Sequence, residues 1–156
     1  MAASINYMGR FAFGRDFDRK RLEPLTYQLS RHFMSRAWHS PFAMRRLRQF
    51  AHTYLALFDH YDLLLTPVLA TPPAEIGFLG ASLDFETATA RLRNYAAFTP
   101  AQNVSGAPAI SLPLGLSSGG LPIGVQFAAA MGEERRLLEV AFELEQAMPW
   151  SYPAAC

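Results

Sequence analysis

Cysteine is nearly absent from the sequence, since Cys156, the last residue, is the only one. A single cysteine excludes an internal disulfide framework and a CxxC metal or redox motif. No apolar run comes near the roughly 18 residues that a transmembrane helix needs. Residues 1–15 contain no continuous apolar segment followed by a small-residue cleavage site. We therefore expect a cytoplasmic protein with no membrane-spanning helix and no secretory leader.

Charged residues are scarce as well, at 17% of the 156 residues, whereas apolar residues make up 51%. Typical soluble domains contain about 25% charged and about 45–50% apolar residues. The composition therefore excludes disorder and predicts a large buried fraction. The length fits one domain or one piece of a larger domain.

The charges are unevenly distributed along the chain. Residues 1–50 carry ten basic and three acidic side chains, a net charge of +7, and residues 51–156 carry four basic and ten acidic ones, a net charge of −6. The basic residues form no run of five or more, so we expect no nucleic-acid partner. Two interpretations stay open: complementary halves of one folded surface, or a basic face that binds a partner protein.

The spacing of apolar residues predicts an α/β fold with four helices. Ser40 and Pro41 are typical of a helix start, because serine caps free amides and proline is favoured at the first helical position. The expected helices cover about 17–37, 41–60, 84–98 and 133–148. One face of the second helix is expected to form a buried stripe of Ala43, Leu47, Phe50, Tyr54, Leu57 and Phe58.

Short apolar runs predict strands over about 62–66, 109–114 and 123–129. Residues 67–82 are rich in proline and glycine and are expected to be a loop. The second and third strands should form a hairpin through the Gly- and Ser-rich residues 115–122. Pro113 has no amide to donate, so the second strand should end there or leave that position unpaired. We interpret residues 1–156 as a single incomplete domain.

No catalytic motif is present in the chain taken alone. A GxSxG nucleophile turn is missing, Ser105 has no base beside it in sequence, and Ser117 and Ser118 fit a hairpin turn better than a catalytic loop. Lys20 is the only lysine and is flanked by arginines, which indicates an exposed face. No residue is therefore predicted to be catalytic.

Metal and cofactor motifs are equally absent. The four histidines form neither HExxH nor a Cys/His pattern, and no phosphate-binding glycine motif occurs. Residues 59–62 (DHYD) combine acidic and imidazole groups, yet they lie at a helix-to-strand junction where capping and surface roles are commoner. We expect neither a metal nor a cofactor.

Three linked segments are more informative than the composition. They are residues 61–67 (YDLLLTP), 98–115 (FTPAQNVSGAPAISLPLG) and 120–127 (GLPIGVQF). A last expected helix, over residues 136–146, follows them. In order and spacing, over roughly residues 40–148, they resemble the amidase signature family. The resemblance implies the C-terminal part of an amidase-signature fold, with strands of a mixed sheet flanked by helices.

Enzymes of that family act on amides with a Ser, cis-Ser, Lys triad whose Gly/Ser-rich signature lies upstream of these segments. No residue of this chain matches the nucleophile, the bridging serine or the lysine. The resemblance therefore implies a C-terminal portion of a hydrolase of carbon–nitrogen amide bonds that lacks the triad and is inactive alone.

The same resemblance implies that residues just before Phe98 and Thr99, together with Phe98 itself, contact the substrate. We call Phe98 and Thr99, which open the 98–115 segment, the FT motif. Tyr95, Ala96 and Phe98 are the candidate substrate-binding residues. Family members that transfer the amide of glutamine carry an acid at the position of Ala96, so an apolar residue there favours a more hydrophobic amide. We interpret Asn103, Gly106, Pro108 and Gln126 as structural, with Gln126 bonding across the sheet.

Two other functions stay open. The chain could be a non-catalytic protein-interaction module, or one half of a split amidase. The expected partners are a small-molecule amide substrate, only in a complete enzyme, and either an N-terminal amidase portion or a second copy of the chain. No nucleic acid and no membrane partner is expected.

Overall fold

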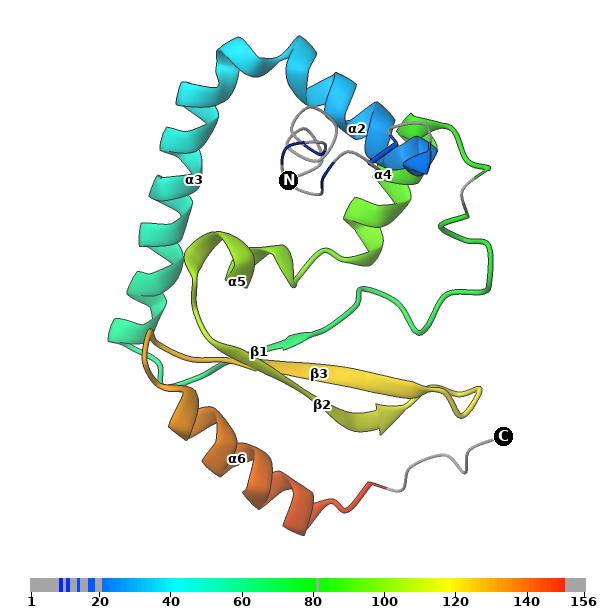
Figure 1. Cartoon of the computed structure of the whole chain (residues 1–156). Helices are drawn as coiled ribbons and strands as arrows, with labels where there is room; N and C mark the ends of the chain where they lie inside the picture. Colours follow the sequence, from blue (N-terminus) through cyan, green and yellow to red (C-terminus); the bar gives the residue numbers. More distant parts are fainter. Residues whose placement is uncertain are drawn as a thin grey trace. The chain divides into compact units, whose positions relative to one another are not determined.

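The computed structural model describes Gly9, Phe11, Gly14, 17–18, 21–80 and 82–150. These residues fall into two compact units (Figure 1). A helical unit comprises residues 1–44 and 75–93, and a sheet unit comprises residues 45–74 and 94–156. Within the described part of the chain, no helix is both long enough and apolar enough to cross a membrane.

The helical unit contains helix α2 (Pro24–Ser35), a 3-10 turn at Ala37–His39, the start of helix α3 (Ser40–Leu55) and most of helix α4 (Phe85–Tyr95). Helix α2 begins at Pro24 rather than at the predicted residue 17. Proline restricts the residue before it to extended backbone, and Glu23 has φ −56° and ψ 142°. Asp84 precedes helix α4, and its Oδ1 accepts a hydrogen bond from the Thr87 amide over 2.9 Å.

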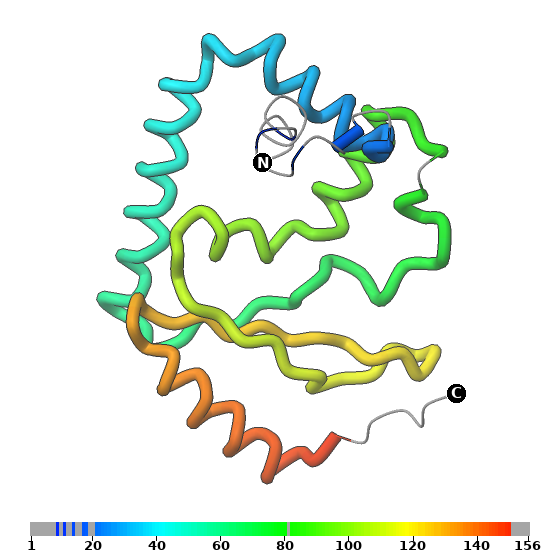
Figure 2. Tube along the Cα trace, viewed as in Figure 1, coloured from blue at the N-terminus to red at the C-terminus, as the bar shows by residue number. Residues whose placement is uncertain are grey.

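The sheet unit contains strands β1 (Leu64–Pro67), β2 (Ala109–Leu116) and β3 (Pro122–Ala128). Their order is β1-β3-β2, and both pairings are antiparallel. The resemblance led us to expect strands of a mixed sheet, which contains parallel as well as antiparallel pairs. Among the described residues, the strand pairs are antiparallel. Figure 2 shows the predicted hairpin as a continuous loop of chain that joins β2 to β3.

Pro113 lies inside β2 rather than at its end. The pairing with β3 shifts between Leu112 and Gly115, which places Pro113 in a β-bulge. A bulge leaves a residue unpaired, so the missing proline amide costs the ladder no hydrogen bond. Of the two outcomes that the sequence left open, the unpaired position is the one observed.

Two helices flank the sequence of the hairpin. The helix expected over 84–98 ends as α4 at Tyr95. A separate helix, α5 (Pro100–Ser105), follows it and was not predicted. Helix α5 ends at Gly106, whose φ of +79° is accessible mainly to glycine. Helix α6 (Glu134–Ala147) lies against β2 and buries Leu137.

The core of the described residues is small. Its buried apolar side chains are Tyr54, Ala88, Ala107, Leu112, Ala128, Ala129 and Leu137. The predicted buried stripe on residues 43–58 is wrong in this chain, because only Tyr54 is buried while Leu47 and Phe50 remain 45% and 44% exposed. Apolar spacing identifies the helix face that is suited to packing, but the face is buried only where another part of the protein contacts it. The helix predicted over 41–60 ends earlier, at Leu55, and a 3-10 turn at Ala56–Asp59 follows it.

Candidate substrate-binding segment

The three predicted substrate-binding residues lie together in the sheet unit, at the end of α4 and in the turn before α5. Tyr95 is the last residue of α4, and Ala96 and Phe98 follow it in irregular backbone. All three are half-buried. We refer to residues 95–99 as the 95–99 segment. The structure places these residues in one stretch of chain and contains no bound molecule that would test their role.

Tyr95 holds one end of the 95–99 segment through two hydrogen bonds to the loop after β1. Its carbonyl oxygen accepts from the Ala70 amide over 3.1 Å, and its Oη accepts from the Ala74 amide over 3.1 Å. Residues far apart in sequence are thereby joined. The part of the proline-rich loop that lies in this unit is consequently attached to the candidate segment.

Gln102 holds the other end of the segment. Its amide is satisfied on all sides when the nitrogen faces the carbonyl oxygens of Phe98 and Thr99, at 3.2 and 3.1 Å. In that orientation its oxygen accepts from Tyr54 Oη over 2.8 Å and from Gln126 Nε2 over 2.9 Å. The opposite orientation leaves the amide nitrogen directed at donors, so the hydrogen-bond network selects the first one.

Gln126 extends this network across the sheet. It is buried on β3 and donates from Nε2 to Thr66 Oγ1 on β1 over 3.3 Å, between residues that are direct partners in the ladder. The interpretation of Gln126 as a residue that bonds across the sheet agrees with this contact. Buried amides require such partners, because an unpaired polar group in the interior is costly.

Tyr54 joins α3 to the same network. Its ring stacks on Phe50 and meets Phe58 edge-on, each with ring centroids 5.9 Å apart. Burial raises the pKa of the Tyr54 phenol, and the hydrogen bond with Gln102 opposes that shift. The phenol therefore remains protonated at neutral pH and able to donate to Gln102.

The motif residues around Gly106 make structural contacts. The Gly106 amide donates to the Gln102 carbonyl over 2.8 Å, and the Ala107 amide donates to Ser105 Oγ over 3.2 Å. Ser105 is therefore engaged in ending helix α5. Asn103 lies exposed on α5 and Pro108 is half-buried.

Gly124, in the GLPIGVQF segment, has close neighbours on both sides. A Cβ atom added there would lie 2.9 Å from Val68 Cγ2 and 3.2 Å from Ser111 Oγ. The Val68 amide also donates to the Gly124 carbonyl over 3.1 Å. The glycine thus permits the chain beyond β1 to lie directly on β3.

Comparison with known proteins decides the family. The amidase family model matches residues 11–138. This chain belongs to the amidase family.

Its relatives include a protein of Mycobacterium leprae that carries the name amidase AmiC. That protein is 47% identical over 151 residues, which cover 97% of this chain and 32% of the relative. The 6-aminohexanoate-cyclic-dimer hydrolase of Pseudomonas sp. (strain NK87) is 48% identical over 96 residues, covering 58% of this chain and 20% of the hydrolase.

A solved structure of 6-aminohexanoate cyclic dimer hydrolase complexed with substrate has a similar fold. It matches with a TM-score of 0.78 and 35% identity, and the match covers 96% of this chain and 33% of the hydrolase. This chain therefore spans about a third of the length of the amidases that it matches along nearly its whole length.

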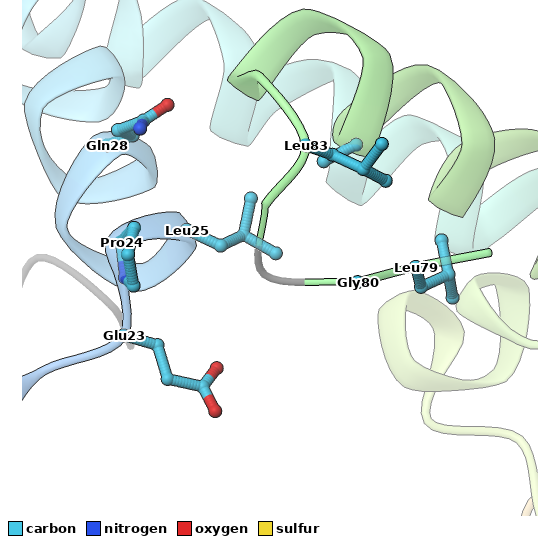
Figure 3. Close-up of a pocket in the computed structure, with 8 residues that line it drawn as sticks. Glu23, Pro24, Leu25, Gln28, Leu79, Gly80 and Leu83 are labelled. Atoms are coloured by element: carbon cyan, nitrogen blue, oxygen red, sulfur yellow. The ribbon is translucent and has the colours of Figure 1, made fainter. Parts of the chain in front are cut away.

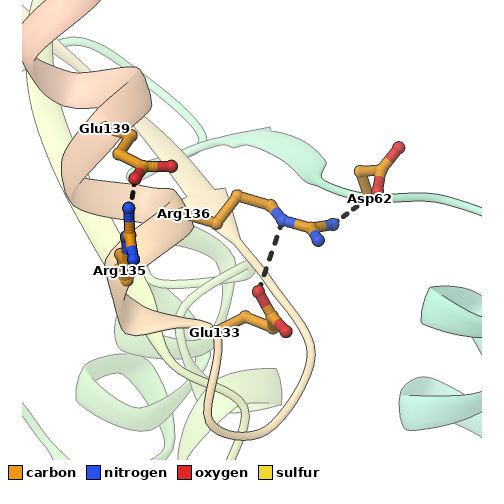
Figure 4. Close-up of polar contacts among 5 residues, drawn as sticks. All are labelled: Asp62, Glu133, Arg135, Arg136 and Glu139. Atoms are coloured by element: carbon orange, nitrogen blue, oxygen red, sulfur yellow. Dashed lines mark hydrogen bonds and ion pairs between the residues drawn. The ribbon is translucent and has the colours of Figure 1, made fainter.

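The other candidate groups of this amidase chain have structural roles. Arg136 on α6 forms ion pairs with Asp62, just before β1, and with Glu133 over 3.4 Å, as Figure 4 shows. A second pair on the helix surface joins Arg135 and Glu139 over 2.7 Å. Asp62 belongs to the 59–62 cluster. Its ion pair with Arg136 connects the start of α6 to the chain before β1, as expected for a surface role.

The serine turn of the amidase hairpin is also structural. Ser117 Oγ accepts a hydrogen bond from the Leu121 amide over 3.0 Å, and the Ser117 amide donates to the Leu121 carbonyl over 2.8 Å. This is the hairpin turn predicted for residues 115–122. Lys20 lies outside the described residues, so its predicted exposure has no structural counterpart.

A small cavity lies within the helical unit, between the start of α2 and the chain before α4 (Figure 3). Its volume is about 140 Å³, below the roughly 300–1,000 Å³ of typical ligand pockets. Leu25 and Leu83 line it with Glu23 at its edge, and none of the predicted substrate-binding residues contributes to it. Among the described residues, no three His, Cys, Asp or Glu side chains are arranged to hold a metal ion.

Sequence reasoning did not identify Tyr54 and Gln102 as members of the site. Tyr54 was assigned to an apolar stripe, and Gln102 was quoted only as part of the 98–115 segment, which begins with the FT motif. Gln102 lies three residues after Thr99, in a segment that, apart from Asn103, is made of small and apolar residues, and this is the feature that could have indicated its role.

Proposed function

We propose that this chain is the C-terminal part of an amidase that hydrolyses carbon–nitrogen amide bonds, and that it supplies part of the substrate pocket. The observation that carries the proposal is the amidase family match over residues 11–138. The triad that activates the nucleophile is assigned to the part of the enzyme outside this chain, and the chain alone is inactive. We assign the complete enzyme to the cytoplasm.

The proposed pocket contribution is the 95–99 segment, through Tyr95, Ala96 and Phe98. Hydrogen bonds to Ala70 and Ala74 at one end support a fixed position for Tyr95. An apolar residue at position 96 supports an apolar substrate, because a buried carboxylate would be needed to hold an amine. The relative that hydrolyses the cyclic dimer of 6-aminohexanoate suggests uncharged cyclic amides as the first substrates to assay.

The part of the enzyme outside this chain is the proposed binding partner of its exposed apolar surfaces. Large exposed side chains such as Phe42, Phe142 and Leu138 support this assignment. The isolated chain should therefore self-associate. Light scattering that shows a monodisperse monomer at high concentration would contradict this part of the proposal.

The first experiment measures the intact mass, in a lysate of the native host, of the species that carries the peptide 137–156. We expect a mass well above 17.4 kDa, because the proposed enzyme requires the additional two thirds seen in its relatives. Detection of a 17.4 kDa species alone would overturn the single-chain proposal. Co-purification of that species with a separate triad-bearing chain would instead indicate a split amidase. A cooperative melt without such a partner or amidase activity would favour an interaction module.

A substitution at position 96 tests the substrate class. In the complete enzyme, Ala96→Glu should raise kcat/KM for amides that carry a primary amine, relative to uncharged amides, by about tenfold, an effect of about 1.4 kcal/mol. Ala97→Glu is the matched control, because Ala97 is exposed in the same turn. An equal change in preference for both variants would show that Ala96 does not contact the substrate.

A further inference from the structure

We propose that Gln102 is a positioning residue of the amide pocket, which orients Phe98 by bonding the carbonyl oxygens of Phe98 and Thr99. The inference rests on the proposed function, because it assigns Gln102 a role in the pocket of that enzyme. Gln102 does not touch the substrate in this proposal, and yet it determines how the substrate is bound, which the proposed function alone does not state.

The backbone of the 95–99 segment connects α4 to α5. Residues 96–98 belong to neither α4 nor α5, and Thr99 is the N-cap residue of α5. The Phe98 carbonyl accepts a long backbone hydrogen bond of 3.4 Å from the Ala101 amide. Segments of this kind depend on side-chain partners for a single conformation. The Gln102 amide nitrogen supplies such partners to Phe98 and Thr99, at 3.2 and 3.1 Å.

Two buried side chains hold Gln102 itself. Its oxygen accepts from Tyr54 Oη on α3 and from Gln126 Nε2 on β3, at 2.8 and 2.9 Å. Both donors are buried, with Tyr54 9% and Gln126 6% exposed. A side chain bonded at both ends of its amide has little rotational freedom, so it transmits the position of helix and sheet to the segment.

The hydrogen bonds of the Gln102 amide form two pairs with different roles. The two bonds made by the Gln102 oxygen join α3 and β3 to α5, and they contribute to folding wherever the substrate binds. The two bonds made by its nitrogen reach only the backbone before α5. A variant that keeps the first pair and removes the second therefore changes pocket geometry while keeping the ties between the elements.

Gln102→Glu is that variant, because a carboxylate accepts from Tyr54 and Gln126 but donates to neither carbonyl. The complementary variant is Tyr54→Phe, which removes one tie and leaves both carbonyl contacts in place. Gln146→Leu, at an exposed position of α6, serves as the control for loss of a glutamine amide.

The test is steady-state hydrolysis of an uncharged cyclic amide by the complete enzyme, with active sites counted by titration of the nucleophile. We expect Gln102→Glu to raise KM at least tenfold, with kcat per active site within about threefold of the parent. Gln146→Leu should leave KM within twofold, and Tyr54→Phe, which removes one of the two ties that hold Gln102, should raise KM by less than Gln102→Glu does. If Gln102→Glu lowers the melting temperature while KM stays unchanged, Gln102 is purely structural and the inference is wrong.

Failure of the proposed function has a separate outcome. A parent enzyme that hydrolyses no amide overturns the proposed function, and hydrogen exchange of the same protein then tests the role of Gln102. Amides of residues 96–99 should exchange at least fivefold faster in Gln102→Glu than in Gln146→Leu. Equal exchange rates would show that Gln102 does not order the segment, and would overturn the inference.

Discussion

The sheet unit and the helical unit differ in how much apolar surface they bury. Six of the seven buried apolar residues of the described chain belong to the sheet unit, and Ala88 alone belongs to the helical unit. Large apolar side chains remain exposed in both units, for example Trp38 in the helical unit and Leu116 in the sheet unit, so the units differ in what they bury rather than in what they expose. Strand pairing between distant residues brings apolar faces together, whereas a helix satisfies its backbone locally and still needs a neighbour to cover its apolar face.

The sharpest way to break this comparison is a large-to-small substitution in the sheet unit. Leu112→Ala on β2 should lower the free energy of unfolding by about 2–5 kcal/mol, because the 6% exposed side chain leaves a cavity. Urea unfolding followed by circular dichroism measures the change. Leu116→Ala, at a 71% exposed position of the same strand, is the control, with an expected change within about 0.5 kcal/mol.

The same measurement on Leu29→Ala compares the units directly. Leu29 lies on α2 in the helical unit and is partly exposed. Its substitution should cost clearly less than that of Leu112. If the two substitutions cost the same free energy, the difference between the units is not one of burial.

A steric substitution tests the close packing of the sheet unit. Gly124→Ala should destabilise the chain by about 1–3 kcal/mol, because the new Cβ would overlap Val68. Adding Val68→Ala removes the overlapping methyl groups and should recover part of that loss, measured as coupling in a double-mutant cycle. Strictly additive effects of the two substitutions would contradict the contact.

The smallest expected effect concerns the helical unit, where local capping has to compensate for little burial. Hydrogen bonds to Thr87 lower the pKa of the Asp84 carboxyl. A lowered pKa contributes stability that is present above the ordinary value of about 4 and is lost as the pH falls through the folded-state value. The expected result is a shift of the Thr87 amide resonance between pH 5 and pH 2, with its midpoint below 4.

Asp84→Ser provides the control for that titration, since serine accepts the same hydrogen bond without titrating in this range. The Thr87 resonance of the serine variant should stay constant. A parent midpoint at or above the ordinary aspartate value would show that the carboxylate does not cap α4.

Much of the sheet unit could be predicted because its determinants are local. The short apolar runs and the Gly- and Ser-rich turn predicted the hairpin, and the missing proline amide predicted that the strand would either end at Pro113 or leave that position unpaired, of which the second is observed. The start of α2 was placed too early because the apolar spacing was extended past Pro24, whose effect on Glu23 is equally local. Helix α5 was missed because six residues offer too short a window for helical periodicity.

The candidate site could be predicted only in part. The position of Tyr95, Ala96 and Phe98 followed from the family motif that begins at Phe98. Their hydrogen-bond partners did not, because Ala74 is 21 residues from Tyr95 and Tyr54 is 48 residues from Gln102. Spacing within a segment carries no information on contacts over such separations.

The sequence by itself determined the family, the helix and strand types and the turn chemistry, since each depends on residues that are neighbours along the chain. Tertiary structure alone decided that β3 lies between β1 and β2, that Tyr54 is buried while Leu47 and Phe50 are not, and that Gln102 meets Gln126. These outcomes depend on which distant surfaces meet. Burial and hydrogen bonding are properties of the pair in contact, so neither partner's own sequence specifies them.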